Sequence, residues 1–535
     1  MPHYVPFESE REQAYVEAGL WRECALPEHL ARWTAQYSTR RAVTDDAAEL
    51  SYAELGRRVR RMAAGFADRG IDSGDRVVVQ LPNTVSFVVV LFALLERGAI
   101  PVLTLPAHRR REIVHLASTS GAVAYVVADS DGHFDFTALA ADVLVEVPGI
   151  RTVFVDGDAG AFTPLSAVDG SVRDFPRPAA TDVAVLLVSG GTTGLPKLIP
   201  RTHNDYEYNA RASAEVCKLE ADDVYLAVLP AGHNFPLACP GILGALGVGA
   251  SVVMTRDSSP DHVFPLVQKY GATVTALVPT LAHLWCEATE WEDADLSSLR
   301  LLQVGGSKLT PEVAKLVAPT LGCTLQQVFG MAEGLLNYTR LGDDENAVIG
   351  TQGRPLSDYD EVRIVDGDGN DVPTGEVGEL LTRGPYTINS YYGAPEHSAT
   401  AITPDGFYRS GDQVKALPTG HLVVTGRIKD VITRNGENVA ADELEDILVT
   451  YPGVSRVAVI GVPDPHLGES VCVVVVPRGE VPSVGDLRAF LVDCGCARHK
   501  LPDRVVAREA LPVTAIGKVD KALLVAESAA RQGTR

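Results

Sequence analysis

Short apolar runs alternate with amphipathic segments up to about residue 350. The runs rich in β-branched residues are RVVVQLP (76–82), AVAYVVAD (122–129), RTVFVDG (151–157), VAVLLVSGG (183–191), VYLAVLP (224–230) and TVTALVP (273–279). Helical patterns lie between them, such as residues 52–70, which end in a glycine. Strands that alternate with helices at this spacing indicate parallel sheets with crossover helices.

The pattern changes after about residue 350. Residues 361–384 predict antiparallel strands, and DGDGND (366–371) is more typical of a hairpin turn than of a calcium loop, because it lacks the required glycine. A compact α+β pattern begins near Lys429. The sequence therefore predicts an α/β protein with a large N-terminal domain, residues 1–428, and a small α+β C-terminal domain, residues 429–535.

Composition narrows the function classes. A chain of 535 residues is too long for one core, and its net charge of −22 argues against nucleic acid as a partner. The polar, acidic N-terminus does not resemble a signal peptide, and the longest apolar run, Phe87–Leu95, is too short to span a membrane. We therefore expect no membrane partner. Eight scattered cysteines without zinc spacing indicate reduced thiols in a cytoplasmic protein.

The strongest chemical signal is LLVSGGTTGLPKLIPRTH (186–203). Glycines after a buried strand let successive backbone N–H groups converge on an anion, while threonine hydroxyls and a lysine add donors and charge. The spacing excludes a Walker loop. The predicted phosphate-binding residues are Ser189, Gly190, Gly191, Thr192, Thr193, Gly194 and Lys197.

This segment resembles the phosphate-binding signature of the acyl-adenylate-forming superfamily. Further signatures of that superfamily follow in order: QVFGMAEG (327–334), YRSGDQ (408–413), GRIKD (426–430) and PVTAIGKVDK (512–521). The resemblance implies parallel and mixed sheets with a distorted barrel subdomain in the N-terminal domain. It also implies that the C-terminal domain is mobile and rotates about a hinge at Lys429.

The resemblance assigns roles to these residues, with ATP and Mg²⁺ as the implied cofactors. Glu333, with Thr193, would bind Mg²⁺, and Asp412 would bind the ribose. Lys518, Glu333 and Arg427 would be the catalytic residues. The remaining contacts to ATP or AMP would come from Gly305, Gly306, Val328, Gly330, Met331, Ala332 and Lys429.

The stretch AGHNFPLACPG (231–241) is expected to form a stiff turn, because prolines at 236 and 240 disfavour a regular helix start or a central strand. Within the superfamily, this turn, YVEAGLWRE (15–23) and residues 323–341 resemble stand-alone aryl-acid ligases of siderophore pathways. In that group the asparagine matched by Asn234 recognises the ortho hydroxyl of a 2-hydroxybenzoate. His233 would orient the acid or cap the turn.

Two residues indicate which aryl acid is the substrate. Ligases of this group that prefer 2,3-dihydroxybenzoate resemble HN[FY]PLSSPG and AEGLVNY, whereas this chain has Cys239 for that serine and Leu336 for that valine. Both changes fill space and reduce polarity near the 3-position. The sequence therefore predicts salicylate as the acid, with Phe235 and Gly306 completing its site. A close analogue, 3-hydroxypicolinate, also satisfies Asn234.

The chain carries no carrier domain of its own, so the acceptor thiol is expected on a separate molecule. The resemblance favours an aryl carrier protein, and coenzyme A is the alternative. The basic segment 497–504 could face either partner, or it could be a solvated surface. A salicylate–CoA ligase is thus the first alternative. A hydrolase and a nicotinamide enzyme are disfavoured, since neither motif is complete. A non-catalytic binder is disfavoured by Glu333, Asp412, Arg427 and Lys518.

Overall fold

The computed structural model describes residues 4–132, 134–189, 195–434, 437–464, 467–494, 496, 500–514 and 517–530. The chain divides into two compact units. The N-terminal unit contains residues 1–191, 195–361 and 382–408, and the C-terminal unit contains residues 192–194, 362–381 and 409–535. This division places residues 362–381 and 409–428 with the C-terminal unit. The functional boundary at Lys429 stays a prediction.

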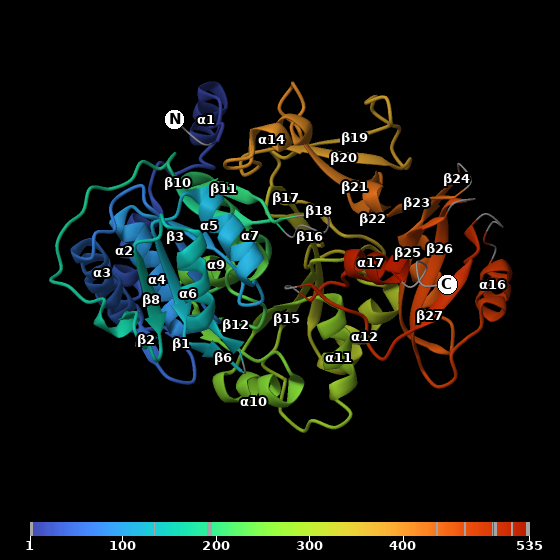
Figure 1. Ribbon diagram of the computed structural model, residues 1–535, viewed down its shortest axis with the longest axis horizontal. Helices are drawn as coiled ribbons and strands as arrows, with labels where there is room; N and C mark the ends of the chain where they lie inside the picture. Colours follow the sequence, from blue (N-terminus) through green and yellow to red (C-terminus); the bar gives the residue numbers. More distant parts are fainter. Residues whose placement is uncertain are drawn as a thin grey trace. The chain divides into compact units, whose positions relative to one another are not determined.

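Two large sheets form the N-terminal unit (Figure 1). The seven-stranded sheet has the order β11(Leu198–Thr202), β10(Val183–Val188), β4(Ile100–Leu103), β3(Arg76–Gln80), β5(Ala124–Ala128), β8(Thr152–Asp156), β9(Thr163–Pro164). The nine-stranded sheet has the order β18(Arg354–Pro355), β17(Gly334–Tyr338), β16(Thr324–Met331), β15(Leu301–Gly305), β14(Val274–Leu277), β12(Val224–Ala227), β13(Ser251–Met254), β1(Arg41–Thr44), β2(Glu49–Ser51). The predicted parallel arrangement is confirmed for their central strands. The edge strands β2, β11 and β18 pair antiparallel, while the edge strand β9 pairs parallel with β8.

Helices cover these sheets. They are α1(Ser9–Glu17), α2(Leu26–Gln36), α3(Tyr52–Asp68), α4(Val85–Arg97), α5(Arg110–Ser120), α6(Phe136–Glu146), α7(His203–Val216), α8(Asn234–Ala238), α9(Gly241–Val248), α10(Pro260–Tyr270), α11(Pro279–Ala288), α12(Pro311–Leu321), α13(Glu345–Gly350) and α14(Pro395–Ala401). Helix α4 explains the longest apolar run, because nearly all of its side chains are buried. Thr84 caps its start, and Gly98 ends it in the left-handed conformation that glycine adopts readily.

The C-terminal unit contains two sheets. The first has the open order β19(Glu361–Val365), β20(Gly378–Arg383), β21(Tyr408–Ala416), β22(Leu422–Arg427). The predicted hairpin is confirmed, since the Asp366 carboxylate accepts the backbone N–H groups of Asp368 and Asn370 within the turn. The 3-10 turn Ile428–Asp430 follows β22.

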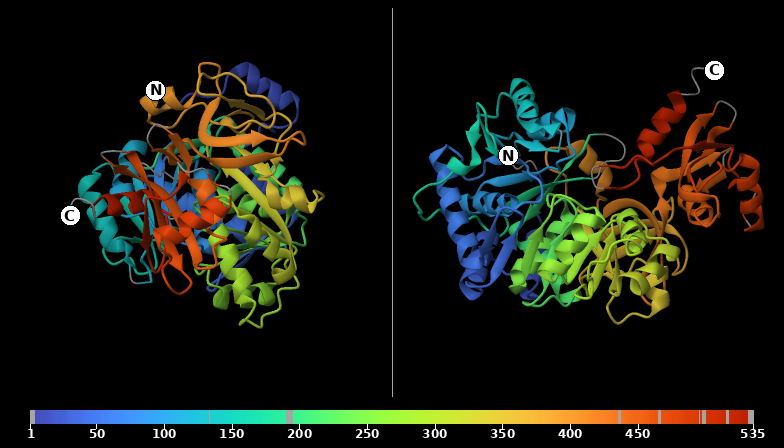
Figure 2. Two further views of the ribbon diagram at one scale, coloured as in Figure 1. Left: turned by 90° about the vertical axis from the view of Figure 1, so that its right-hand side faces the viewer. Right: turned by 90° about the horizontal axis from the view of Figure 1, so that it is seen from below.

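The second sheet carries helices on both faces. Its strands are β23(Val431–Arg434), β24(Glu437–Ala440), β25(Val454–Asp464), β26(Gly468–Pro477) and β27(Arg504–Ala507). Alternate residues of β26 face opposite sides: Val473 packs with α15(Ala441–Leu448) and α16(Val484–Asp493), and Val474 packs with α17(Lys521–Ala530). Figures 1 and 2 show α16 and α17 on opposite sides of this sheet. The predicted compact α+β pattern is therefore confirmed.

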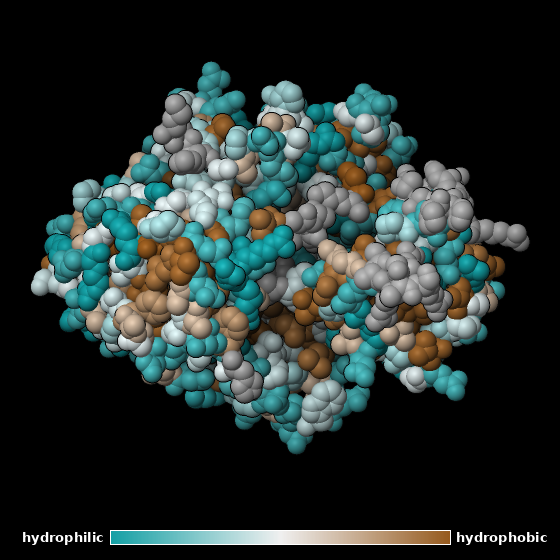
Figure 3. Space-filling model, in the orientation of Figure 1, coloured by the Kyte–Doolittle hydropathy of each residue, from teal (hydrophilic) through white to brown (hydrophobic). Residues whose placement is uncertain are grey.

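The surface and the cysteines agree with the composition. Within the described residues, no helix combines the length and apolarity that crossing a membrane requires. The face drawn in Figure 3 is largely hydrophilic, with smaller hydrophobic groups between the polar side chains. All eight cysteines are free thiols, as predicted.

Candidate active site

The candidate acid-binding residues come from the carboxyl ends of neighbouring strands in the nine-stranded sheet. The segment with Asn234 follows β12, Gly305 and Gly306 lie at the end of β15, and the hairpin β16–β17 carries Leu336. Loops at the carboxyl ends of parallel strands are the usual binding sites of open α/β sheets. The sheet therefore brings together residues that are far apart in the sequence.

The expected turn at residues 231–241 is wrong in one respect, because Asn234–Ala238 form the short helix α8. Pro236 lies in the first turn of α8, where its missing N–H would have no helical partner. Pro240 precedes the next helix, α9. His233 caps α8 by accepting the Phe235 N–H at its Nδ1, at 3.2 Å, which supports the capping role of this residue.

Asn234 is 5% exposed, and its two amide atoms have different environments. Its Nδ2 donates to the Cys239 sulfur at 3.5 Å, while the Cys239 thiol donates to the backbone carbonyl oxygen of Asn234 at 3.5 Å. Burial raises the pKa of the Cys239 thiol to about 12, so it stays protonated and able to donate. The Asn234 Oδ1 is buried and has no hydrogen-bond partner among the described residues.

Two glycines bring the other residues of the acid site close together. A Cβ on Gly305 would lie 3.1 Å from the Phe235 ring and 2.5 Å from the Val328 carbonyl oxygen. A Cβ on Gly330 would lie 2.4 Å from Cδ2 of Leu336, its partner across the β16–β17 hairpin. Both positions therefore need glycine for close approach.

Glu333 lies in the turn between β16 and β17 and is held by an aromatic residue that the sequence analysis missed. Its carboxylate Oε1 accepts the Tyr391 hydroxyl at 2.8 Å, and its carbonyl oxygen accepts the Ile388 N–H. The Tyr391 hydroxyl lies 3.1 Å from that of Tyr408, and the Lys197 Nζ lies 5.9 Å from the centre of the Tyr391 ring. Burial, together with the Glu333 charge, raises the pKa of Tyr391.

The glycine-rich loop is described only at its ends. Gly190, Gly191, Thr192, Thr193 and Gly194 lie outside the described residues. Ser189 and Lys197 hold the base of the loop, since the Ser189 N–H donates to the Lys197 carbonyl oxygen at 2.9 Å and the Lys197 N–H donates to the Ser189 Oγ at 3.0 Å. This antiparallel base continues the β10–β11 pairing.

In the C-terminal unit, Asp412 and Arg427 face each other across the β21–β22 hairpin. The Arg427 Nε donates to the Asp412 Oδ1 at 2.7 Å. Burial raises the pKa of the Asp412 carboxyl, and the charges of Arg427 and Lys518 oppose that rise. The candidate ribose-binding carboxylate is therefore buried beside two cations.

Lys518 lies on a tight turn. Val513 and Val519 pair across it, the Thr514 N–H donates to the Lys518 carbonyl oxygen at 2.6 Å, and Gly517 adopts a φ of 81°. Lys429 lies in the 3-10 turn Ile428–Asp430, and its side chain lies outside the described set. Its role as a hinge stays a prediction.

A buried cation beside Ala332, one of the residues predicted to contact the nucleotide, also escaped the sequence analysis. Arg201 is fully buried, donates from Nε to the Asp205 Oδ1 at 2.7 Å, and donates from Nη1 to the Ala332 carbonyl oxygen at 3.2 Å. The motif PRTH, directly after the glycine-rich loop, was a signal for it, because a charged residue within a buried strand needs a partner.

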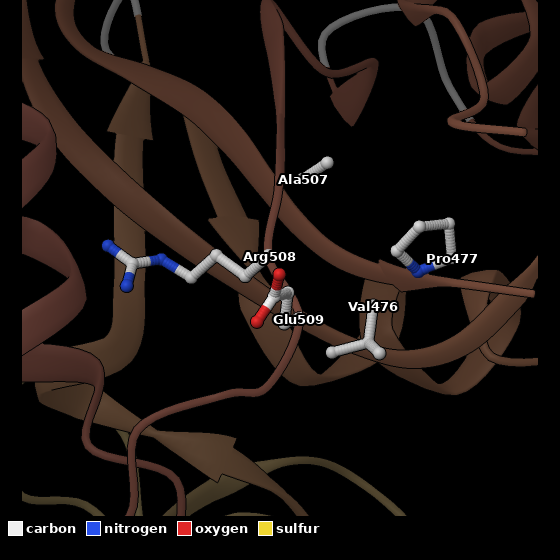
Figure 4. A pocket seen from close by; sticks show the side chains of 5 residues that line it. All are labelled: Val476, Pro477, Ala507, Arg508 and Glu509. Carbon is white, nitrogen blue, oxygen red and sulfur yellow. The ribbon is translucent and has the colours of Figure 1, made fainter.

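No cluster of His, Cys, Asp and Glu suited to holding a metal ion occurs in the described part of the chain. A single carboxylate such as Glu333 is compatible with Mg²⁺, which is usually bound by one or two carboxylates plus substrate phosphates and water. A separate surface pocket in the C-terminal unit is lined by Val476, Pro477, Ala507, Arg508 and Glu509 (Figure 4). It contains none of the predicted site residues.

This fold and these residues define an adenylate-forming enzyme. The chain matches the AMP-binding enzyme model over residues 30–392 and the AMP-binding enzyme C-terminal domain over residues 443–518. The chain therefore belongs to the AMP-binding enzyme family and is an ATP-using, AMP-forming ligase.

Individual relatives cover nearly the whole chain. It is 51% identical over 530 residues to a salicyl-AMP ligase / salicyl-S-ArCP synthetase of Mycobacterium tuberculosis, covering 98% of this chain and 94% of the relative. It is 47% identical over 521 residues to a 2,3-dihydroxybenzoate-AMP ligase of Bacillus subtilis, covering 97% of both. An apo structure of MbtA from Mycobacterium smegmatis is similar, with 51% identity, a TM-score of 0.78 and coverage of 98% and 99%.

Proposed function

We propose that this protein activates salicylate as salicyl-AMP, with release of pyrophosphate, and then transfers the salicyl group to the phosphopantetheine thiol of a separate aryl carrier protein. The pathway would be siderophore-type or other nonribosomal peptide synthesis. The relationship to a salicyl-AMP ligase and the chemistry of the acid-binding residues support this proposal.

The Asn234 side-chain amide selects which acid is bound. Its buried Oδ1 has no partner within the described residues, so it can accept the ortho hydroxyl of salicylate. A buried acceptor left unpaired costs about 1–3 kcal/mol, so benzoate would bind about tenfold or more weakly. His233 caps α8 by accepting the Phe235 N–H and therefore contributes to this site by fixing the first turn of the helix that Asn234 begins.

Cys239 and Leu336 favour salicylate over 2,3-dihydroxybenzoate. The sulfur of Cys239 already exchanges hydrogen bonds with Asn234, and sulfur is a weak partner for a second hydroxyl. Leu336 lies against Gly330 and is 3% exposed, so its side chain fills space that a valine would leave open.

The proposed first step is attack of the salicylate carboxylate on the α-phosphorus of ATP, which forms the acyl phosphate bond and breaks the bond to pyrophosphate. Lys518 would donate to the α-phosphate and the carboxylate, which repel each other. Asp412 would accept the ribose hydroxyls, and Arg427 would hold Asp412 in place. Glu333, with Thr193, would bind Mg²⁺, which neutralises charge on the departing pyrophosphate.

In the second step a thiolate attacks the acyl carbonyl, and AMP leaves. Lys518 serves the first step, so we propose that residues 429–535 rotate about Lys429 between the two steps. A carrier protein is preferred as the source of the thiol because the name of the mycobacterial relative includes a carrier-linked product. Coenzyme A is the alternative acceptor.

ATP–pyrophosphate exchange with salicylate, 2,3-dihydroxybenzoate, benzoate and 3-hydroxypicolinate tests the proposal. We expect salicylate to exchange at least about tenfold faster than benzoate and well ahead of the dihydroxy acid. Equal or faster exchange with 2,3-dihydroxybenzoate would show that Cys239 and Leu336 do not set specificity. Transfer to a purified carrier protein and to coenzyme A, measured side by side, would identify the acceptor.

A further inference from the structure

A buried side chain outside the acid site contacts the residues that hold Asn234. Asn209 lies on α7 and is 1% exposed. Its Nδ2 donates to the Ala238 carbonyl oxygen at 2.6 Å and lies 4.0 Å from the Cys239 sulfur. Ala238 and Cys239 end the short helix that Asn234 begins, so one amide fixes the end of the segment that carries the acid-recognising amide.

A cation sets the orientation of Asn209. The Arg201 Nη2 donates to the Asn209 Oδ1 at 3.4 Å, and the Arg201 Nε is paired with Asp205 at 2.7 Å. Since the guanidinium has only donors, the Asn209 oxygen must face Arg201 and its NH₂ group must face Ala238 and Cys239. The buried contacts therefore run without interruption from Arg201 through Asn209 and Cys239 to Asn234.

The contacts of Cys239 with Asn234 determine which side-chain atom Asn234 presents to the acid. The Cys239 thiol donates to the backbone carbonyl oxygen of Asn234, and the sulfur lone pairs accept a hydrogen bond from the Asn234 Nδ2. The side-chain Oδ1 of Asn234 is therefore the atom without a hydrogen-bond partner among the described residues. An open acceptor selects an acid with a hydroxyl donor. If the sulfur moved, the Asn234 amide could turn and present its NH₂ group instead.

We propose that Asn209 is a specificity-determining positioning residue: held by Arg201, it fixes Ala238 and Cys239 so that Asn234 presents its Oδ1 to the ortho hydroxyl of the acid. This inference rests on the proposed function, since it deepens the recognition of the acid by Asn234. It predicts that loss of Asn209 affects binding of salicylate but not of benzoate, which has no ortho hydroxyl.

The test is a double-mutant cycle of Asn209→Ala and Asn234→Ala, with dissociation constants for salicylate and benzoate measured by calorimetry. We expect Asn209→Ala to reduce the salicylate preference by about three- to tenfold and to change benzoate binding by less than about twofold. The double variant should show the same preference as Asn234→Ala alone, because Asn209 acts through Asn234.

Asn204→Ala is the matched control. Asn204 is also a buried amide on α7, at 3% exposure, but its Oδ1 accepts the Glu23 N–H instead of contacting the acid site. We expect this variant to keep the full salicylate preference. Asn209→Asp is the second variant, because it keeps the size and the partner for Arg201 while it removes the donor to Ala238; it should lose the preference as Asn209→Ala does.

The outcomes separate this inference from the proposed function. If the unchanged protein binds salicylate and benzoate equally, recognition by Asn234 fails and the inference fails with it. If Asn234→Ala removes the preference but Asn209→Ala and Asn209→Asp keep it, the inference is overturned and the proposed function stands. Equal weakening of both acids in the Asn209 variants, as in a purely structural defect, would also overturn the inference.

Discussion

The asparagine proposed to recognise the acid and the lysine predicted to be catalytic are held in different ways. Asn234 is 5% exposed, begins a helix and contacts Cys239, which a side chain from another helix helps to fix. Lys518 lies on a turn whose backbone is closed by Thr514 and by the pair Val513 and Val519. Val513 on that turn is 53% exposed. One group is fixed by the core, and the other by a local turn.

The difference follows from what each group has to do. Recognition of a small acid needs an atom fixed to within a fraction of an ångström, which buried polar contacts provide. In the proposed two-step reaction, the lysine serves the first step and moves away for the second. A self-contained turn can keep its shape while its surroundings change. Predictions for the two regions can therefore be made separately.

Lys518→Ala should have the largest effect. Removal of a cation that stabilises charge in the transition state lowers the rate by about 10²–10³-fold, so ATP–pyrophosphate exchange with salicylate should fall by that amount. Transfer of the salicyl group from chemically prepared salicyl-AMP to the acceptor should change by less than about threefold, because Lys518 is proposed to serve only the first step.

Lys415→Ala on β21 is the control for charge and should affect neither step. An equal loss in both steps of the Lys518 variant would contradict the separation of roles between the two regions. Unchanged exchange would remove Lys518 from catalysis altogether.

Several elements and candidate site residues of the two units could be predicted from the sequence because the patterns that indicate them are short and local. Helix α16 begins after Ser483, whose hydroxyl accepts the Asp486 N–H, and the capping pattern is visible in the sequence. Asp412 and Arg427 were each predicted from a short motif, although their pairing across the β21–β22 hairpin was not. Glu333 lies beside glycines whose lack of a side chain allows close approach of other groups.

Contacts between distant residues could not be predicted. Tyr391 binds Glu333 across 58 positions, and Asn209 contacts Ala238 from a different helix. Helix α8 could not be predicted for another reason, since Pro236 disfavours a helix interior although the first turn of a helix accepts proline. Sequence patterns report local geometry and burial, but the partner of a buried polar group depends on the packing of the fold.

The pair Cys239→Ser and Leu336→Val should change the choice of acid. Serine adds a stronger hydrogen-bonding group and valine removes a methylene, so exchange with 2,3-dihydroxybenzoate relative to salicylate should rise by about tenfold. Competition between the two acids in the exchange assay measures this ratio. Leu336→Val alone should give the smaller part of the change, and a ratio unaltered in the double variant would contradict the assignment of these residues.

Tyr391→Phe tests whether the Tyr391 hydroxyl orients the Glu333 carboxylate, which lies in the same N-terminal unit. The variant loses the hydroxyl that donates to the Glu333 carboxylate at 2.8 Å but keeps the aromatic ring. Because loss of a group that orients a metal ligand weakens metal binding by about 10–100-fold, the Mg²⁺ concentration for half-maximal exchange should rise by about tenfold. Tyr392→Phe is the control, and an equal Mg²⁺ requirement in both variants would exclude the role.

Asp360→Asn should have the smallest effect, on stability instead of catalysis. The Asp360 residue is partly exposed, but its carboxyl is buried. Its Oδ2 accepts the Tyr386 hydroxyl at 2.5 Å, and the Tyr386 hydroxyl in turn accepts the Leu336 N–H. Burial raises the pKa of the Asp360 carboxyl from its ordinary value near 3.8 to about 7. A carboxyl with a raised pKa binds its proton more tightly when folded, so stability should fall as the pH rises from about 4 to about 7.

The amide introduced by that substitution cannot titrate and still offers an oxygen to Tyr386, so the variant should lack this decline. Urea unfolding at pH 5 and pH 7.5, followed by tryptophan fluorescence, compares the two proteins. All of the tryptophans, Trp21, Trp33, Trp285 and Trp291, lie in the N-terminal unit that contains Asp360. One pKa unit corresponds to about 1.4 kcal/mol, so the free energy of unfolding of the variant relative to the original should rise by about 1–3 kcal/mol between these pH values. If the free energies of unfolding of the two proteins depended on pH in the same way, the Asp360 carboxyl would ionise normally. Water would then reach this carboxyl more easily than its burial indicates.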